Sequence, residues 1–254
     1  MVIVAIIQAR VGSTRLPKKV LAEIEGKPML LHIIDRVKQA KRIDKIIIAT
    51  TELKKDKKII KIAKESGVEY FRGSENDVLD RYYQAAKKFS ANTIVRITGD
   101  CPVVDPQLID KTVDFFLKNN YDHVSTAYPK ATFPDGLDIW VFSFQALERA
   151  WKEAVLPSER EHVTSYMWKH RELFKIATFQ NDEDLSNMRW TVDEQIDLKF
   201  IRAIYKRLYK PGKLFLMKDI LNLLNKEPKL AKINQSISRD EGYKKSLKEN
   251  EKSK

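Results

Sequence analysis

The feature that most constrains the fold is a regular alternation of apolar runs and amphipathic segments in the first half of the chain. The apolar runs read VIVAII, KIIIAT, VEYF and TIVRITGD. Each is followed by aliphatic or aromatic residues at helical spacing, as Leu30, Ile34 and Val37 follow the first run. This alternation predicts an α/β fold in which a mostly parallel sheet has helices on both faces.

The second half of the chain alternates less regularly. Its strand-like runs read HVSTA, DIWVF, FKIATF and MRWTV. Its helical patterns lie at 146–154, 162–172, 194–209 and around 220–224. We therefore expect one domain over residues 1–226 with an irregular lobe or dimer arm at about 128–190, which would allow a homodimer. The basic segment 227–254 has little to bury, so we expect a partly disordered tail.

Composition excludes several classes of protein. No apolar stretch approaches the roughly 20 residues that are needed to cross a bilayer, so we expect no membrane span. The first apolar run lacks the basic leader and the cleavage site of a signal peptide. A single cysteine, Cys101, excludes an internal disulfide. These features together favour a cytoplasmic protein.

The formal net charge of +12 permits two interpretations. Lysines spread over solvated helix faces would explain it, and ELKKDKKIIKIAKE has that pattern. Alternatively, the excess attracts phosphate groups on a nucleic acid or on a small nucleotide. The chain has no zinc-finger spacing, RNP-type strand or basic helical repeat, so we expect no nucleic-acid partner. A small phosphate ligand is the better functional interpretation.

A basic segment, QARVGSTRLPKK, follows the first expected strand. Ligands of open α/β sheets bind beyond the carboxyl ends of the strands, where this segment would lie. Its candidate phosphate ligands are Arg10, Gly12, Ser13, Thr14, Arg15, Lys18 and Lys19. It lacks the spacing of Walker-type loops and of the glycine-rich dinucleotide motif. We therefore predict a phosphate-binding loop of another kind.

Two acids end strand-like runs. Asp100 follows TIVRITG, and carboxylates at such positions commonly bind Mg²⁺ beside phosphates. It could instead cap the next helix, but Asp105 is better placed to do so. Asp193 follows MRWTV and is either a helix cap or a second metal ligand. Phosphoryl chemistry with a hard cation favours the second role, because Asp100 needs a partner.

The stretches IIQARVGSTRLPKKVL, VRITGDCPVVDP and RWTVDEQIDL, in this order, resemble the cytidylyltransferase superfamily that includes the CMP-Kdo and CMP-sialic acid synthetases. RGSENDVLDRYYQAA, PDGLDIWVF and SEREHVTSYMW resemble its spore-coat polysaccharide biosynthesis protein F branch. The resemblance runs from about Val2 to Tyr209. It implies a Rossmann-like nucleotide-diphospho-sugar transferase fold. It also implies Mg²⁺-dependent attack of an acidic sugar on the α-phosphate of CTP, giving a CMP-sugar and pyrophosphate for surface polysaccharide synthesis.

The resemblance also implies roles for single residues. Matching positions make Arg10, Ser13, Arg15 and Lys19 triphosphate ligands, within a nucleotide-binding loop that includes Ala9 and Gly12. Catalysis would depend on Arg10, Arg15, Lys19 and Asp100, and Mg²⁺ would be bound by Asp100 and Asp193. Gly73 and Ser74 match positions that recognise base and ribose, and Asp80 and Arg81 match the segment that faces the sugar.

The acceptor and the reaction class leave alternatives open. Arg160 and His162 begin an expected helix and could bind a sugar carboxylate. Alternatively, Arg160 pairs locally with the neighbouring glutamates. A related glycosyltransferase would need an Asp-x-Asp motif at a strand end, and the chain offers only the acidic loop Asp182–Asp184. A nucleotide-binding protein without turnover is the remaining alternative.

Overall fold

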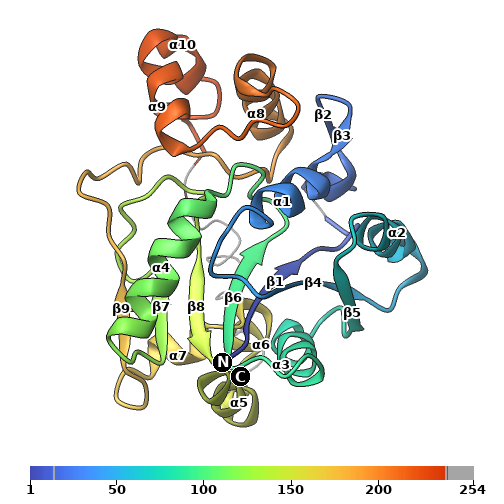
Figure 1. The fold of residues 1–254 in the computed structure, drawn as a ribbon, viewed down its shortest axis with the longest axis vertical. Helices are drawn as coiled ribbons and strands as arrows, with labels where there is room; N and C mark the ends of the chain where they lie inside the picture. Colours follow the sequence, from blue (N-terminus) through green and yellow to red (C-terminus); the bar gives the residue numbers. More distant parts are fainter. Residues whose placement is uncertain (14, 238, 240–254) are drawn as a thin grey trace.

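The computed structural model describes residues 1–13, 15–237 and 239, and its centre is a seven-stranded sheet (Figure 1). The sheet strands are β1 (Ile3–Gln8), β4 (Lys45–Thr51), β5 (Glu69–Gly73), β6 (Thr93–Thr98), β7 (His123–Ser125), β8 (Trp140–Ser143) and β9 (Ile176–Thr178). Their order is β5-β4-β1-β6-β8-β7-β9. Strands β5, β4, β1 and β6 are parallel, and β8 is antiparallel to both of its neighbours. The expected α/β class is confirmed.

Helices connect the strands, and a small hairpin of β2 (Glu23–Ile24) and β3 (Lys27–Pro28) extends from the loop after β1. The longer helices are α1 (Met29–Val37), α2 (Lys57–Glu65), α3 (Val78–Lys88), α4 (Pro106–Lys118), α5 (Phe144–Glu153), α8 (Gln195–Leu208) and α9 (Met217–Lys226). The shorter ones are η1 (Lys19–Leu21), η2 (Lys54–Asp56), α6 (Pro157–His162), α7 (Ser165–Lys169) and α10 (Pro228–Ala231). Figure 1 shows α8, α9 and α10 gathered at one end of the molecule.

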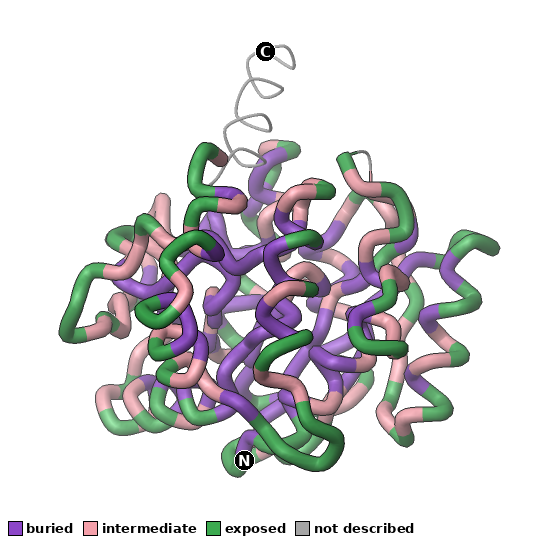
Figure 2. Tube along the Cα trace, turned by 90° about the horizontal axis from the view of Figure 1, so that it is seen from above, coloured by how far each residue is buried: buried purple, intermediate pink, exposed green. Residues whose placement is uncertain are grey.

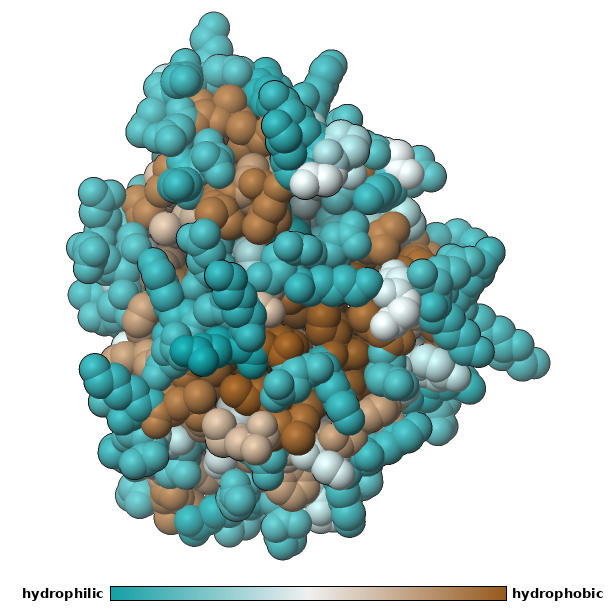
Figure 3. All heavy atoms as spheres, viewed as in Figure 1, coloured by the Kyte–Doolittle hydropathy of each residue, from teal (hydrophilic) through white to brown (hydrophobic). Residues whose placement is uncertain are grey.

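Two hydrophobic cores lie on the two faces of the sheet because side chains alternate along each strand. In β1, Ala5 and Ile7 belong to the core that includes α1, α4 and α8, whereas Val4 and Ile6 belong to the core that includes α3 and α5. Figure 2 shows buried chain in the interior and exposed chain at the periphery, and Figure 3 shows a face on which hydrophilic residues surround a hydrophobic area. The parallel strands therefore read as continuous apolar runs, since both of their faces are covered.

Two expected elements are wrong. Within the described part of the chain, the run MRWTV forms no strand of the sheet, and its Arg189 makes an isolated β-bridge with Asp135. Its Val192 N–H donates to the carbonyl of Asp100 at 2.8 Å, so the segment crosses the strand ends instead of lying beside a strand. The helix expected over 162–172 is divided into α6 and α7, because Val163 between them has a positive φ of 58°.

The segment that we expected to be a tail begins with ordered structure. It contains α10, and the side chain of Asn234 beyond it is only 2% exposed. Residues 238 and 240–254 of this segment lie outside the described residues. Arg239 is described, and its guanidinium contacts the carboxylate of Asp138 and the carbonyl of Phe133. Over the described residues, no helix is both long and apolar enough to cross a membrane.

Candidate functional site

A pocket of about 550 Å³ opens beyond the carboxyl ends of β1 and β6. This volume is within the range of small-molecule sites, roughly 300–1,000 Å³. Its charged lining residues are Arg10, Arg15, Lys19, Arg81, Arg96, Asp100, Asp135, Asp138, Glu161, Arg189 and Asp193, with His162 beside them. Ala9, Gly12 and Ser13 also line it. The pocket lies where the topology of an open α/β sheet places a ligand.

The basic segment after β1 forms a loop that is fixed to the body of the protein by a buried acid. The carboxylate of Asp56 accepts a hydrogen bond from the Val11 N–H at 2.7 Å and another from the hydroxyl of Thr51. The chain then turns back at Lys18, which has a φ of 61° and donates its N–H to the Val11 carbonyl at 3.2 Å. Lys18 itself is exposed and does not line the pocket. Thr14 lies outside the described residues.

The ammonium group of Lys19 lies between the two predicted metal ligands. Its Nζ is 2.9 Å from Asp100 Oδ2 and 2.7 Å from Asp193 Oδ1. Burial by itself would lower the pKa of Lys19, but the two carboxylates outweigh it, and the pKa is raised. Burial would likewise raise the pKa of Asp100, but Lys19 and the side chains of Thr98 and Cys101 lower it to about 2. Lys19 and Asp100 therefore form a charged pair at neutral pH, with the Asp193 carboxyl beside the ammonium group.

The donor set of this cluster fits a hard divalent cation. Asp100 and Asp193 come from distant parts of the chain, and their oxygens converge on the single position that the Lys19 ammonium occupies. Mg²⁺ is commonly held by one or two carboxylates together with water and substrate phosphates. Across the described residues, no group of three or more His, Cys, Asp or Glu side chains forms a complete metal cage. The two carboxylates are thus a partial site, which suits a metal that arrives with a nucleotide.

Asp193 is held in place by a buried network that sequence reasoning did not identify. The guanidinium of Arg189 contacts Asp135 at 2.8 Å, Asp197 at 3.0 Å and Asp193 at 3.4 Å. Asp197 also accepts the N–H groups of Asp193 and Glu194, each at 3.0 Å, and so caps α8. Asp193 is therefore free of the capping role that we had kept as an alternative. The only hint in the sequence is the clustering of charges in MRWTVDEQID.

Two glycines let chain segments approach closely at the site. Gly136 has a φ of 106°, and a Cβ there would lie 2.5 Å from the backbone nitrogen of Thr191. Gly99 follows β6, and a Cβ there would lie 2.7 Å from the carbonyl oxygen of Gln8. Both distances are too short for a side chain, so these positions require glycine.

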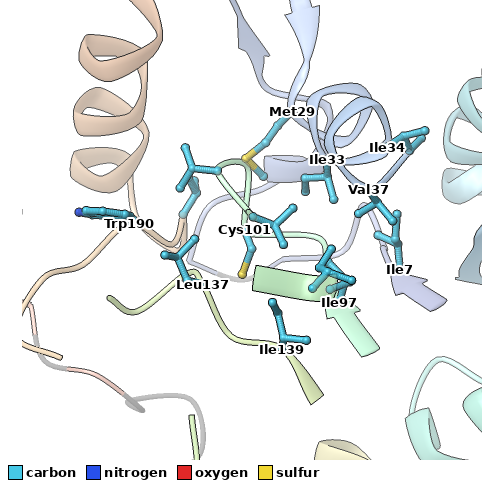
Figure 4. Close-up of a cluster of buried hydrophobic side chains, with 14 of the residues drawn as sticks. Ile7, Met29, Ile33, Ile34, Val37, Ile97, Cys101, Leu137, Ile139 and Trp190 are labelled. Atoms are coloured by element: carbon cyan, nitrogen blue, oxygen red, sulfur yellow. The ribbon is translucent and has the colours of Figure 1, made fainter. Parts of the chain in front are cut away.

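Cys101 belongs to the apolar floor beneath the pocket. Figure 4 shows its sulfur among Ile97, Leu137 and Ile139. Burial, with the nearby Asp100 charge, raises the pKa of this thiol well above its ordinary value. The neutral thiol donates a weak hydrogen bond to Asp100 Oδ1 at 3.6 Å. Cys101 thus contacts Asp100 through a buried, neutral thiol.

The structure brings some predicted residues into the pocket and leaves others outside it. Arg81 and His162 line the pocket, whereas Gly73, Ser74 and Asp80 do not. The carboxylate of Asp80 accepts hydrogen bonds from the indole of Trp151 at 2.9 Å and from Gln84 at 3.1 Å. Asp80 therefore connects helices, and the expectation that it faces a sugar has no support from its position.

Arg160 also lies outside the pocket lining. Its Nε is 2.9 Å from Asp77 Oδ2, and its Nη1 donates to the carbonyl of Trp151 at 2.7 Å. These contacts join α6 to the start of α3 and to the end of α5. The acidic loop Asp182–Asp184 contributes nothing to the pocket lining either.

Comparison with known proteins agrees with this geometry. The sequence profile of a family described as cytidylyltransferase matches residues 4–222. The chain belongs to this cytidylyltransferase family. The protein is therefore an enzyme of the class that transfers a cytidylyl group from CTP, and the expected family is confirmed.

Relatives cover most of this cytidylyltransferase. It is 32% identical over 241 residues to the spore coat polysaccharide biosynthesis protein SpsF of Bacillus subtilis, covering 90% of this chain and 96% of that protein. The structure of a cytidylyltransferase from Leptospira borgpetersenii matches with a TM-score of 0.88 and 35% identity, covering 94% of this chain and 100% of the other.

A more distant structure shows the same fold. CMP:2-keto-3-deoxy-manno-octonic acid synthetase, solved in complex with CTP, matches with a TM-score of 0.63 and 18% identity. The match covers 82% of this chain and 100% of that one. It confirms the Rossmann-like nucleotidyltransferase architecture of the cytidylyltransferase described here.

Proposed function

We propose that this cytidylyltransferase catalyses Mg²⁺-dependent transfer of the cytidylyl group from CTP to a hydroxyl of an anionic sugar, giving a CMP-sugar and pyrophosphate. The observation on which the proposal mainly depends is the placement of the Lys19 ammonium between Asp100 and Asp193 at the end of the basic loop. A cation-rich loop and a pair of convergent carboxylates are what a triphosphate and its metal require.

The basic loop supplies positive charge to the triphosphate. Arg10 and Arg15 line the pocket with side chains that are 43% and 34% exposed. The Arg10 guanidinium lies 3.9 Å from Glu75, and that of Arg15 lies 3.0 Å from Asp193, so Arg15 already contacts the carboxylate cluster. Lys19 lies deeper, at 14% exposure, between the two carboxylates. Attack on an α-phosphate demands positioning and charge neutralisation more than covalent catalysis, and these three cations provide both.

Bound Mg²⁺ would neutralise charge on the phosphates and help to orient the α-phosphate. In this proposal its protein ligands are Asp100 and Asp193. Arg189 and Asp197 keep Asp193 directed at the site through the contacts described above. These two residues are therefore positioning residues for the metal site.

The nucleoside half of the pocket lies toward β5 in this proposal. Arg81 lines that side, and its Nη1 donates to the carbonyl of Ser74. A Cβ at Gly73 would be 3.1 Å from Arg81 Cγ, so the glycine makes room for that side chain. Gly73 and Ser74 would thus act on base and ribose recognition through Arg81.

The expected homodimer stays a prediction.

The test is pyrophosphate release from CTP and Mg²⁺ with a panel of acidic, phosphorylated and neutral sugars. We expect release with at least one anionic sugar and no comparable release with UTP, ATP or GTP. Lys19→Ala should lower turnover by about 100-fold or more, the scale of losing one electrostatic stabiliser. Wild-type turnover in Lys19→Ala, or no release with any acceptor despite CTP binding, would contradict the proposal.

A further inference from the structure

The floor of the pocket contains a buried arginine that the site described so far does not use. Arg96 is the fourth residue of β6, pairs in register with Ile6 of β1 and Trp140 of β8, and is only 6% exposed. It nevertheless lines the pocket. Because Val95 and Ile97 face the opposite core, Arg96 lies on the side of the sheet that α3 covers.

The contacts of Arg96 hold its guanidinium without neutralising it. Its Nε donates to Gln8 Oε1 at 3.2 Å, and its Cζ lies 4.2 Å from the ring centre of Trp140 and 6.0 Å from that of Tyr82. Across the described residues, no carboxylate lies within 4.0 Å of it. A buried cation without a counter-charge is costly unless another group satisfies it.

The acidic residues of the pocket lining have other partners. Asp100 and Asp193 contact Lys19, Asp135 contacts Arg189, Asp138 contacts Arg239, and Glu161 lies 3.7 Å from His162. Behind Arg96, the buried ring of His123 supplies no negative charge, and burial together with Arg96 lowers the pKa of this histidine to about 3. The positive charge of Arg96 is thus left to face the pocket.

The sheet order places this charge on the acceptor side. Strand β6 lies between β1, which leads into the basic loop, and β8. The pocket residues Asp138, just before β8, and Glu161 and His162, from α6, complete the part of the lining beyond the basic loop. A triphosphate bound by the basic loop would leave this part of the pocket for the second substrate.

We propose that Arg96 binds an anionic group of the acceptor, either a carboxylate or a phosphate ester, and so selects acidic acceptors. This inference rests on the proposed function and names the residue that would give it its acceptor class. A planar guanidinium fixed by aromatic rings and Gln8 presents paired donors that suit such an anion. Arg160, the arginine that the sequence offered as a candidate for this role, contacts Asp77 and the carbonyl of Trp151 instead.

The experiment compares wild-type protein with Arg96→Gln and Arg96→Lys, and uses Arg160→Gln as a control. The control removes a partly buried arginine of the same region that does not line the pocket. Two measurements are made on each protein. The first is pyrophosphate release with 3-deoxy-manno-octulosonate, mannose 6-phosphate and mannose. The second is thermal stabilisation of the CTP-saturated protein by acetate and by inorganic phosphate, which needs no turnover.

We expect Arg96→Gln to weaken use and binding of the preferred anion by about 10- to 100-fold, the scale of a lost charge-assisted hydrogen bond, with CTP affinity changed less than about threefold. The anion affinity of Arg96→Lys should lie between those of wild type and Arg96→Gln, because lysine keeps the positive charge but lacks the planar pair of donors. Arg160→Gln should lower the melting temperature without changing anion preference. If the substitution weakens only acetate binding and the use of carboxylate acceptors, the site binds a carboxylate. If it weakens only phosphate binding and the use of phosphorylated acceptors, the site binds a phosphate ester.

Two results would overturn the inference. The first is that Arg96→Gln binds the anions with the same dissociation constants as wild type. The second is that Arg96→Gln loses as much affinity for CTP as for the anions, which would assign Arg96 to the nucleotide or to the fold. If Arg96→Gln does not fold, Arg96→Lys with unchanged anion preference overturns it equally. Failure of the proposed function has a different signature. Wild-type protein would then bind CTP yet release no pyrophosphate with any acceptor, while the anion titration would still report on Arg96.

Discussion

Replacing Asn234 by alanine should destabilise the protein far more than its place near the end of the described chain suggests. Its Nδ2 donates to the carbonyl of Arg189 at 3.0 Å and to Asp197 Oδ1 at 2.9 Å, and the residue is 2% exposed. Losing the first bond costs about 1 kcal/mol, and losing the bond to a carboxylate costs about 1.5–3 kcal/mol. The sum, about 3 kcal/mol, corresponds to a melting temperature lower by roughly 6–12 °C for a domain of this size.

The assay is thermal unfolding followed by circular dichroism, with a urea titration for the free energy of unfolding. Asn222→Ala is the matched control, because Asn222 is exposed on α9 and its loss should change the melting temperature by about 1 °C or less. A melting temperature of Asn234→Ala within 1 °C of wild type would refute the reasoning. It would mean that solvent replaces both hydrogen bonds and that the network around Arg189 does not depend on the end of the chain.

Two further changes test the same region. Gly136→Ala should destabilise by more than about 2 kcal/mol, since its φ is 106° and a Cβ would lie 2.5 Å from the Thr191 nitrogen; a urea titration that gives wild-type stability would contradict this. For Asp197, burial would raise the pKa, but the bonds from Arg189 and Asn234 lower it below its ordinary value. Its stabilising contribution is thus complete above the unfolded pKa, about 3.9, and is lost as pH falls below it. The free energy of unfolding of Asp197→Asn should be lower than that of wild type at pH 7, and the difference should narrow at pH 3. Urea titrations that give the same difference at both pH values would contradict this prediction.

The sequence predicted the parallel half of the fold because each of its strands is buried on both faces and so appears as an unbroken apolar run. The segment around MRWTV misled the same reasoning. Its apolar residues Trp190 and Val192 are buried, as in a strand, but they pack beneath the strand ends while Arg189 and Thr191 bind loops. Burial and strand pairing leave the same pattern in a sequence, and only the position of a pairing partner distinguishes them.

The sequence predicted which residues line the pocket well where one local motif supplies them and poorly where distant segments meet. The basic loop, Asp100 and Asp193 follow strand-like runs and do line the pocket, while their roles toward phosphate and metal stay predictions. Arg96 was overlooked because one arginine inside an apolar run gives no sign of which face it takes or what lies opposite. Arg160 was misplaced for a related reason, since its partner Asp77 is 83 residues away in the chain.

The contacts of Arg189 have a consequence for synthesis of the chain. This guanidinium joins a carboxylate 54 residues earlier, and the carbonyl of the same residue accepts a bond from an amide 45 residues later. A nascent chain that has emerged from the ribosome only as far as α9 contains every strand of the sheet but lacks Asn234. Because Asn234 is synthesised after every strand of the sheet, the sheet can assemble during translation, whereas the network that supports Asp193 is completed only once Asn234 has emerged.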